Sequence, residues 1–225
     1  MDRDTFNLLE GYMAECMQDS AHDREHVYRV LYTALDIART EQGVDMDVLI
    51  SACLLHDIGR QEQFQNPALD HAVVGAEKAH RFMTAHGFPA DMVGRVAECI
   101  RAHRFRTGEA PRLIEARILF DADKVDVSGA MGIARTLIYQ GHEGEPLYSL
   151  LPDGRVSDGS GDAVPSFMQE YRFKLEKLYE RFYTARGAQI ARARQSAAAA
   201  FYEALLSEAR AVNDNGHELL EDALG

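Results

Sequence analysis

A histidine and an aspartate stand side by side at the end of the most apolar stretch of this 225-residue sequence. The stretch is "SACLLHDIGR", in which His56 and Asp57 follow a run that is apolar around most of a helix. Such a helix is buried on nearly all sides, so we expect His56 and Asp57 to be buried too. A carboxylate at the negative, C-terminal end of a helix is disfavoured by a few tenths to about 1 kcal/mol. We therefore expect a cation beside Asp57, either an arginine in an ion pair or a metal ion.

Three more histidines belong to expected helices, and two of them, His26 and His103, are expected to point inward. In "REHVYRVLYTALDIA", His26 flanks the apolar stripe, and Arg29 lies one turn further on, where it can reach an anion. His103 continues the apolar face of "MVGRVAECIRA", and His71 lies one turn before Gly75, a residue that lets two helices approach closely. The pattern predicts that these side chains line a common interior site.

The segment "EARILFDADKVDVSGA" supplies three acidic residues, and helical spacing ranks them. Asp123 falls on the inward, apolar side of the helix. Asp121 falls on a line with Arg117 and Lys124, which predicts ion pairs on the surface. Asp126 lies one turn beyond Asp123 and could support a ligand from behind.

Two histidines and two carboxylates, His26, His56, Asp57 and Asp123, form a mixed nitrogen and oxygen set. Such a set suits a divalent transition ion (Mn, Fe, Co, Ni or Zn) better than Mg or Ca, which prefer oxygen ligands alone. Four protein ligands on an octahedral ion leave two positions for a water and a phosphate oxygen. The metal lowers the pKa of that water, which makes it a nucleophile at neutral pH.

Composition excludes several other classes of protein. The sequence is 46% hydrophobic and 27% charged, and no apolar run reaches the roughly 18 residues of a membrane span. The net charge of -12 opposes binding to extended nucleic acid. The three cysteines lack disulfide or zinc spacing, and the acidic N-terminus does not resemble a signal peptide. We expect a cytoplasmic protein that does not contact membranes.

Apolar residues recur at helical spacing nearly throughout, which predicts an all-α fold in a single domain, residues 1–211. A Gly- and Pro-rich segment, 141–165, is expected to be a flexible loop or lid, and the acidic residues 212–225 a solvated tail. We expect roughly eight helices, over residues 5–18, 23–41, 46–57, 68–86, 90–104, 113–139, 166–185 and 187–211.

Five blocks of the sequence together resemble the HD-domain superfamily of metal-dependent phosphohydrolases. They are "HDREHVYRV", "LLHDIGR", "DHAVVGA", "IRAHR" and "ILFDADKVDVSGAMGIAR". The C-terminal "SFMQEYRFKLEKLYERF" is similar to the helices of a bacterial branch that includes nucleotide pyrophosphohydrolases, although a histidine common in relatives is missing from it. The resemblance implies an HD-type helical bundle and hydrolysis of a small phosphorylated substrate, with nucleotides as the favoured class.

The resemblance also implies roles for single residues. His26, His56, Asp57 and Asp123 would be the metal ligands, and Asp57 would also act in catalysis by orienting or deprotonating the water. His71 and His103 match positions that hold a second ion in some relatives and face the substrate in others. The nearest candidates for phosphate contacts are Arg29, Arg104 and Lys124.

Two other functions are compatible with the sequence. Some proteins of this fold use six such residues as a mixed-valence di-iron oxygenase. A nucleotide-sensing or scaffolding domain could keep the metal for stability alone. A bundle with incidental core histidines is less favoured, because ligand types recur at inward positions of several helices. The metal, the number of ions and the oligomeric state are left open. The six residues that the oxygenase would use are His26, His56, Asp57, His71, His103 and Asp123.

Overall fold

The computed structural model describes residues 1–17, 24–104 and 110–225, and within these ranges the protein is helical and has no strand. The prediction of an all-α fold is confirmed. The ends of two expected helices, residues 18 and 23, lie outside the described residues. The chain forms two compact units. Unit 1 comprises Met1–Asp126 and Phe182–Ala188, and unit 2 comprises Val127–Arg181 and Gln189–Gly225.

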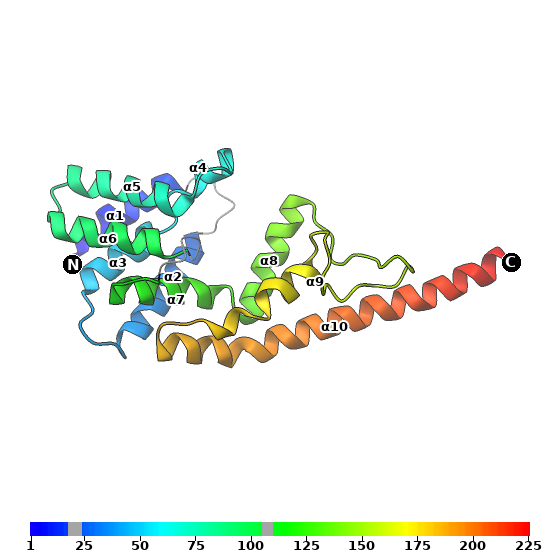
Figure 1. The fold of residues 1–225 in the computed structure, drawn as a ribbon. Helices are drawn as coiled ribbons and strands as arrows, with labels where there is room; N and C mark the ends of the chain where they lie inside the picture. Colours follow the sequence, from blue (N-terminus) through cyan, green and yellow to red (C-terminus); the bar gives the residue numbers. More distant parts are fainter. Residues whose placement is uncertain (18–23, 105–109) are drawn as a thin grey trace. The chain divides into compact units, whose positions relative to one another are not determined.

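Unit 1 is a helical bundle built around α3 (Figure 1). Helix α3 packs against α1, α2, α5, α6 and α7, while α5 runs along α6 and α2 along α7. This central place explains why the apolar run of α3 covers nearly its whole circumference. The helices are α1 (Arg3–Cys16), α2 (Arg24–Ala38), α3 (Met46–Leu55), α4 (Arg60–Gln65), α5 (His71–Ala85), α6 (Ala90–Ala102) and α7 (Ile114–Asp126).

Just after the end of α3, the backbone at Gly59 lies very close to the backbone of α5. The Asp45 side chain caps the start of α3 by accepting hydrogen bonds from two backbone N–H groups, and the helix ends at Leu55. A Cβ at Gly59 would lie 2.4 Å from the carbonyl oxygen of His71 and 2.6 Å from the backbone nitrogen of Gly75. Only glycine fits there, and this contact brings the turn after α3 against the start of α5. The short helix α4, which the sequence did not predict, follows directly.

The expected helix over residues 113–139 is wrong, because the chain breaks it after Asp126. Helix α8 (Gly129–Glu143) starts anew at Gly129, whose φ of 62° lies in the left-handed region. A Cβ at Gly132 would lie 2.1 Å from the carbonyl oxygen of Val127, so this turn has no room for a larger residue at position 132. Helical periodicity continues across such a break, which is why the sequence pattern did not reveal it.

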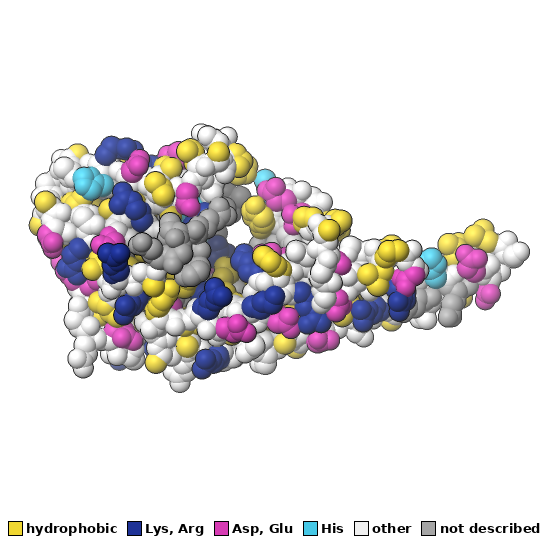
Figure 2. Space-filling view, viewed as in Figure 1, with side chains coloured by type: hydrophobic (Ala, Val, Ile, Leu, Met, Phe, Trp, Pro, Cys, Tyr) yellow, Lys and Arg dark blue, Asp and Glu magenta, His cyan; other side chains and the backbone are white. Residues whose placement is uncertain are grey.

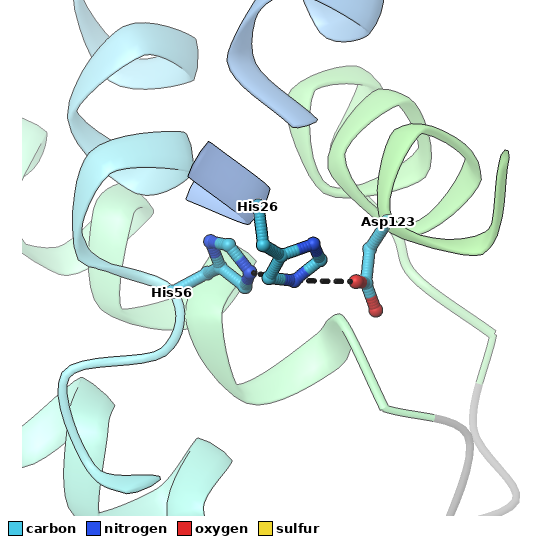
Figure 3. Close-up of side chains that lie close together, drawn as sticks. All are labelled: His26, His56 and Asp123. Atoms are coloured by element: carbon cyan, nitrogen blue, oxygen red, sulfur yellow. Dashed lines mark hydrogen bonds and ion pairs between the residues drawn. The ribbon is translucent and has the colours of Figure 1, made fainter. Parts of the chain in front are cut away.

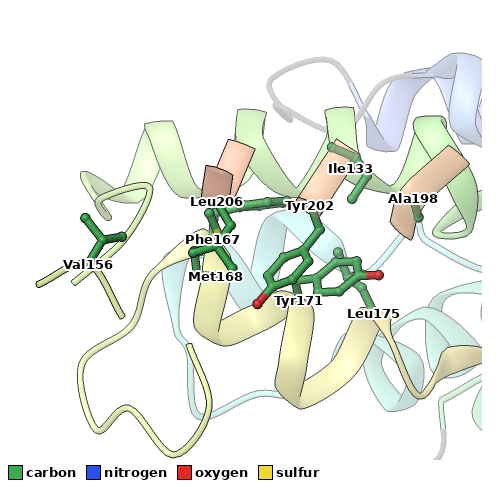
Figure 4. Close-up of a cluster of buried hydrophobic side chains, with 9 residues drawn as sticks. All are labelled: Ile133, Val156, Phe167, Met168, Tyr171, Leu175, Ala198, Tyr202 and Leu206. Atoms are coloured by element: carbon green, nitrogen blue, oxygen red, sulfur yellow. The ribbon is translucent and has the colours of Figure 1, made fainter. Parts of the chain in front are cut away.

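Unit 2 holds its own hydrophobic core (Figure 4). Expected as one helix, residues 166–185 instead form α9 (Phe167–Glu170), a π-helical turn η1 (Tyr171–Leu175) and a 3₁₀ turn η2 (Leu178–Glu180). In the core the Tyr171 ring stacks on Tyr202 of α10 (Ala185–Leu224), with centroids 4.2 Å apart. The core residues are Ile133, Val156, Phe167, Met168, Tyr171, Leu175, Ala198, Tyr202 and Leu206.

The segment expected as a loop contains hydrogen bonds of its own, and the segment expected as a tail is helical. Asp162 accepts hydrogen bonds from Ser149 (2.5 Å) and Ser157 (2.7 Å) in the loop, where Val156 is buried. Helix α10 continues to Leu224 through the expected tail, whose hydrophobic side chains stay exposed at the C-terminal end (Figure 2). The proposed roles of these segments as lid and tail remain predictions. No helix of the described residues is long and apolar enough to cross a membrane.

Candidate metal centre

Four histidines of unit 1 turn their Nε2 atoms toward one another. His26 comes from α2 and His71 from the start of α5, whereas His56 and His103 directly follow α3 and α6. The Nε2 atoms of His26 and His56 are 3.4 Å apart, and those of His71 and His103 are 3.2 Å apart. All four side chains are at most 3% exposed. The sequence expectation that these histidines point inward is thus what the structure shows.

Asp57 lies between these two pairs of histidines. Its Oδ2 is 3.5 Å from Nε2 of His26 and 3.6 Å from Nε2 of His56. Its Oδ1 is 3.3 Å from Nε2 of His71 and 3.7 Å from Nε2 of His103. One carboxylate therefore faces two groups of potential ligands. We call His26, His56 and Asp123 the first triad, and Asp57, His71 and His103 the second triad.

Asp123 completes the first triad from α7. Its Oδ1 lies 3.3 Å from Nε2 of His26, and Figure 3 shows His26 between His56 and Asp123. The side chain of Asp123 is 24% exposed, whereas Asp57 is buried. Of these two carboxylates, only that of Asp123 is therefore partly accessible to solvent.

The outer nitrogen, Nδ1, of each histidine has a partner of its own. An acceptor at Nδ1 keeps the ring proton there and turns the Nε2 lone pair toward the centre, as a metal ligand requires. The Nδ1 partners are Asp126 Oδ2 for His26 (2.8 Å), the Cys53 carbonyl for His56 (2.8 Å), Gln63 Oε1 for His71 (2.6 Å) and the Ile100 carbonyl for His103 (2.6 Å).

The charges of the centre perturb the pKa values of its members. Burial lowers the pKa of His56 to about 4, so its imidazole is neutral at pH 7. Burial alone would also lower the pKa of His26, but hydrogen bonds to the surrounding carboxylates, Asp123 first, raise it to about 10. Burial opposes ionisation of Asp57, yet the Arg60 guanidinium holds its pKa well below the usual range. Positive charge is thus strongly favoured at the first triad.

The residues present fit a divalent transition ion. Oδ2 of Asp57 is buried and makes no hydrogen bond, an unusual state for a carboxylate oxygen unless a cation satisfies it. Three carboxylates, those of Asp57, Asp123 and Asp126, gather around His26. Imidazole and carboxylate donors together suit Mn, Fe, Co, Ni or Zn. These His and Asp clusters could hold a metal ion, although its identity does not follow from them.

The three expected phosphate contacts have other partners within unit 1. Arg29 donates to Asp126, the support of His26, at 2.7 and 3.1 Å. The Arg104 guanidinium lies 3.1 Å from Nδ1 of His71 and 3.6 Å from a carboxylate oxygen of Asp70. The Lys124 ammonium lies 5.5 and 5.0 Å from the ring centroids of Phe120 and Phe182. Contact of these three cations with phosphate remains a prediction.

Two residues of the centre were not named from the sequence, although an arginine beside Asp57 was one of the two expected cations. Arg60 donates to Oδ1 of Asp57 at 2.9 Å, and the i, i+3 spacing of the two residues could have revealed this pair. Gln63 lies against His71, but it belongs to the unpredicted helix α4, and its sequence context gave no signal.

The expectation that Asp121 forms surface ion pairs is wrong. It is fully buried, and its Oδ2 accepts hydrogen bonds from the backbone N–H and the hydroxyl of Thr184, both at 2.7 Å. The backbone N–H of Tyr183 also donates to it. These residues lie about sixty positions away in the sequence, so local periodicity could not indicate the contact.

The sequence of this chain is similar to those of known proteins. Residues 24–128 match the family model described as HD domain. The uncharacterized protein YpgQ of Bacillus subtilis is 29% identical over 135 residues, 58% of this chain and 63% of YpgQ. The alignment thus spans less than two thirds of YpgQ.

Several solved structures share the fold. A structure of YpgQ in complex with ADP has a TM-score of 0.68 at 22% identity and covers 89% of this chain and 97% of that one. A Lactobacillus plantarum protein has a TM-score of 0.72 at 23% identity and covers 92% and 98%. A predicted HD superfamily hydrolase from an uncultured Thermotogales bacterium has a TM-score of 0.58 at 28% identity and covers 92% and 91%.

The matched region contains both triads in full, together with Asp126, Arg60 and Gln63. The part of the chain that holds both triads is therefore similar to the HD domain.

Proposed function

We propose that this protein is a metal-dependent phosphohydrolase that acts on a nucleotide or another small phosphoester or phosphoanhydride. The observation that carries the proposal is the position of Asp57, which lies within 3.7 Å of four imidazole nitrogens. Its Oδ2 faces His26 and His56, and its Oδ1 faces His71 and His103. The HD superfamily hydrolase among the structural neighbours supports a hydrolase, and the ADP complex of YpgQ supports a nucleotide as substrate.

The first triad together with Oδ2 of Asp57 would hold the ion. A divalent ion bound there supplies a water of lowered pKa and polarises a phosphoryl oxygen. Asp57 would also orient that water or accept its proton. Arg60 fixes the other oxygen and so prevents the carboxylate from turning away. The exposed side of Asp123 gives the substrate its access.

The cationic side chains near the triads would bind the phosphate group. Arg29 and Arg104 are about as exposed as Asp123, with side chains 29% and 22% accessible, so each can exchange an internal partner for a phosphate oxygen. His71 and His103 would face the substrate from the second triad. Lys124 is a third candidate, on the same helix as Asp123.

The test is the substitution Asp57→Ala, assayed against a panel of nucleoside mono-, di- and triphosphates with Mn²⁺. We expect hydrolysis and bound metal to be lost while the helical circular dichroism signal is retained. The matched control is Asp91→Ala, an exposed carboxylate in the first turn of α6, which should keep both. Full activity in Asp57→Ala would contradict the mechanism, and tight nucleotide binding without turnover in the unmodified protein would favour a sensing domain.

A second candidate is a di-iron oxygenase, favoured by the fact that all six residues of both triads lie together. This function requires two irons per chain and oxygen uptake that depends on an organic substrate. Iron analysis of the purified protein, followed by measurement of oxygen uptake, separates it from the hydrolase.

A further inference from the structure

The short helix α4 carries two of the residues that contact the candidate metal centre. Nε of Arg60 donates to Oδ1 of Asp57 at 2.9 Å, and Oε1 of Gln63 lies 2.6 Å from Nδ1 of His71. The helix follows the turn after α3 and packs against α5 (Figure 1). One side of α4 is therefore turned toward the centre.

Phe64 lies on this same side of α4. Successive residues of an α-helix are about 100° apart, so Arg60, Gln63 and Phe64 fall within about 100° of the circumference. An aromatic residue on the inward side of a helix is usually covered by the rest of the protein. Phe64 is instead 70% exposed, the highest value among the phenylalanine and tyrosine residues that the structure describes in unit 1. An accessible aromatic ring thus lies on the side of α4 that contacts the centre.

The cations on this side of the centre suit a phosphate group. The side chain of Arg60 is 24% exposed, and only its Nε has a hydrogen-bond partner among the described residues. Its terminal nitrogens carry further N–H donors, which bind phosphate oxygens strongly. The side chain of Arg104 is 22% exposed and contacts the same nitrogen of His71 as Gln63 does. Two partly exposed guanidinium groups therefore contact residues of the second triad.

The spacing of Phe64 and Arg60 matches the parts of a nucleotide. The two residues are one helical turn apart, with about 6 Å between their Cβ atoms. In a nucleotide one sugar separates the base from the first phosphate, so a base against Phe64 and a phosphate against Arg60 can belong to the same molecule. Aromatic side chains stack on any base, because every base has a π-face.

We propose that Phe64 is a specificity-determining residue that stacks on the base of a nucleotide whose phosphates contact Arg60 and the metal centre. This inference rests on the proposed function, since it names the residue of that site that recognises the base. The ring favours nucleotides over phosphate compounds without a base, and it discriminates little among the bases.

The first test compares two ligands that differ only by the nucleoside, the α,β-methylene analogue of ADP and methylenediphosphonate, titrated calorimetrically in the presence of Mn²⁺. Phe64→Ala should weaken binding of the ADP analogue about 5- to 100-fold and leave the affinity for methylenediphosphonate within about two-fold. The matched control is Tyr32→Ala on α2. It removes a ring that is 63% exposed and stacks on Tyr28, and it should change neither affinity.

The second test uses the absence of tryptophan from the sequence. Phe64→Trp introduces a single fluorophore and keeps an aromatic ring, so the affinity for the ADP analogue should stay within a few-fold of the original. We expect the bound base to quench this fluorescence and methylenediphosphonate to leave it unchanged. Tyr32→Trp is the matched reporter, and its fluorescence should respond to neither ligand.

Three results would overturn the inference: an unchanged affinity for the ADP analogue in Phe64→Ala, an equal loss of affinity for both ligands, or no quenching in Phe64→Trp. Hydrolysis of phosphoesters by a protein that binds the ADP analogue independently of Phe64 would contradict this inference alone. Binding that depends on Phe64, without hydrolysis of any phosphorylated compound, would support the inference and contradict only the proposed function.

Discussion

The two triads of unit 1 each consist of two histidines and one aspartate, and Asp57 of the second also faces the first, yet their surroundings differ. The first triad lies among carboxylates and opens to solvent at Asp123, whose side chain is 24% exposed. The second is closed, with His71 and His103 at most 3% exposed, and its neighbours are Arg60 and Arg104. The kinds of ligand therefore do not define a metal site by themselves, because the groups that hydrogen-bond to the ligands set their protonation and charge.

The largest effect should come from removing one histidine of each triad in turn. His26→Gln should abolish tight Mn²⁺ binding, since it deletes the ligand that three carboxylates surround. His71→Gln should retain one tightly bound ion. The metal content of both variants is measured after gel filtration. Equal losses of Mn²⁺ in the two would show that the triads do not differ in metal binding.

A smaller effect on metal affinity is expected from substitution of the side chains that contact Nδ1 of His26 and His71. Asp126→Asn should lower the affinity for the tight ion about 10- to 100-fold, because it weakens the acceptor that orients His26. Gln63→Leu makes the corresponding change behind His71 and should leave that affinity within a few-fold of the original. Calorimetric titration with Mn²⁺ compares the two, and a greater loss in Gln63→Leu would reverse the assignment of the triads.

Gly59→Ala tests the close contact between the backbone of the turn after α3 and the backbone at the start of α5. The added Cβ would lie 2.4 Å from the carbonyl oxygen of His71, so the turn must shift, at a cost of about 1–3 kcal/mol in the free energy of unfolding. The matched control is Gly94→Ala on α6, where a Cβ meets nothing within 4 Å and stability should rise by about 0.5–1 kcal/mol. Urea unfolding measures both; no loss of stability in Gly59→Ala would refute the role of the close contact.

The smallest effect on the metal should come from Asp121→Ala. This change leaves the buried N–H of Thr184 without its acceptor and should cost about 1–3 kcal/mol of stability. Because the hydrogen bonds that Asp121 accepts come from Tyr183 and Thr184, which lie outside both triads, tight Mn²⁺ binding should be retained. A lost ion would instead show that the chain near Thr184 helps to position Asp123 on the same helix.

Much of the first triad was predictable from sequence alone. Helical spacing placed His26 beside an apolar stripe and Asp123 on an inward side, and His56 and Asp57 were expected to be buried because they follow a helix that is apolar nearly all round. Most helices of unit 1 followed from the same periodicity. The break after Asp126 and the π and 3₁₀ turns of unit 2 did not, because apolar spacing looks alike across them.

The sequence by itself determined which kinds of atoms meet in the centre, because helical periodicity fixes which side chains turn inward. Only the tertiary structure decided which oxygen of Asp57 faces which histidines and which side chains contact the outer nitrogens of His26 and His71. Those partners, Asp126, Gln63 and Arg104, belong to other elements than the histidines that they contact. Their distances depend on packing between elements, such as the contact at Gly59, which no local pattern encodes.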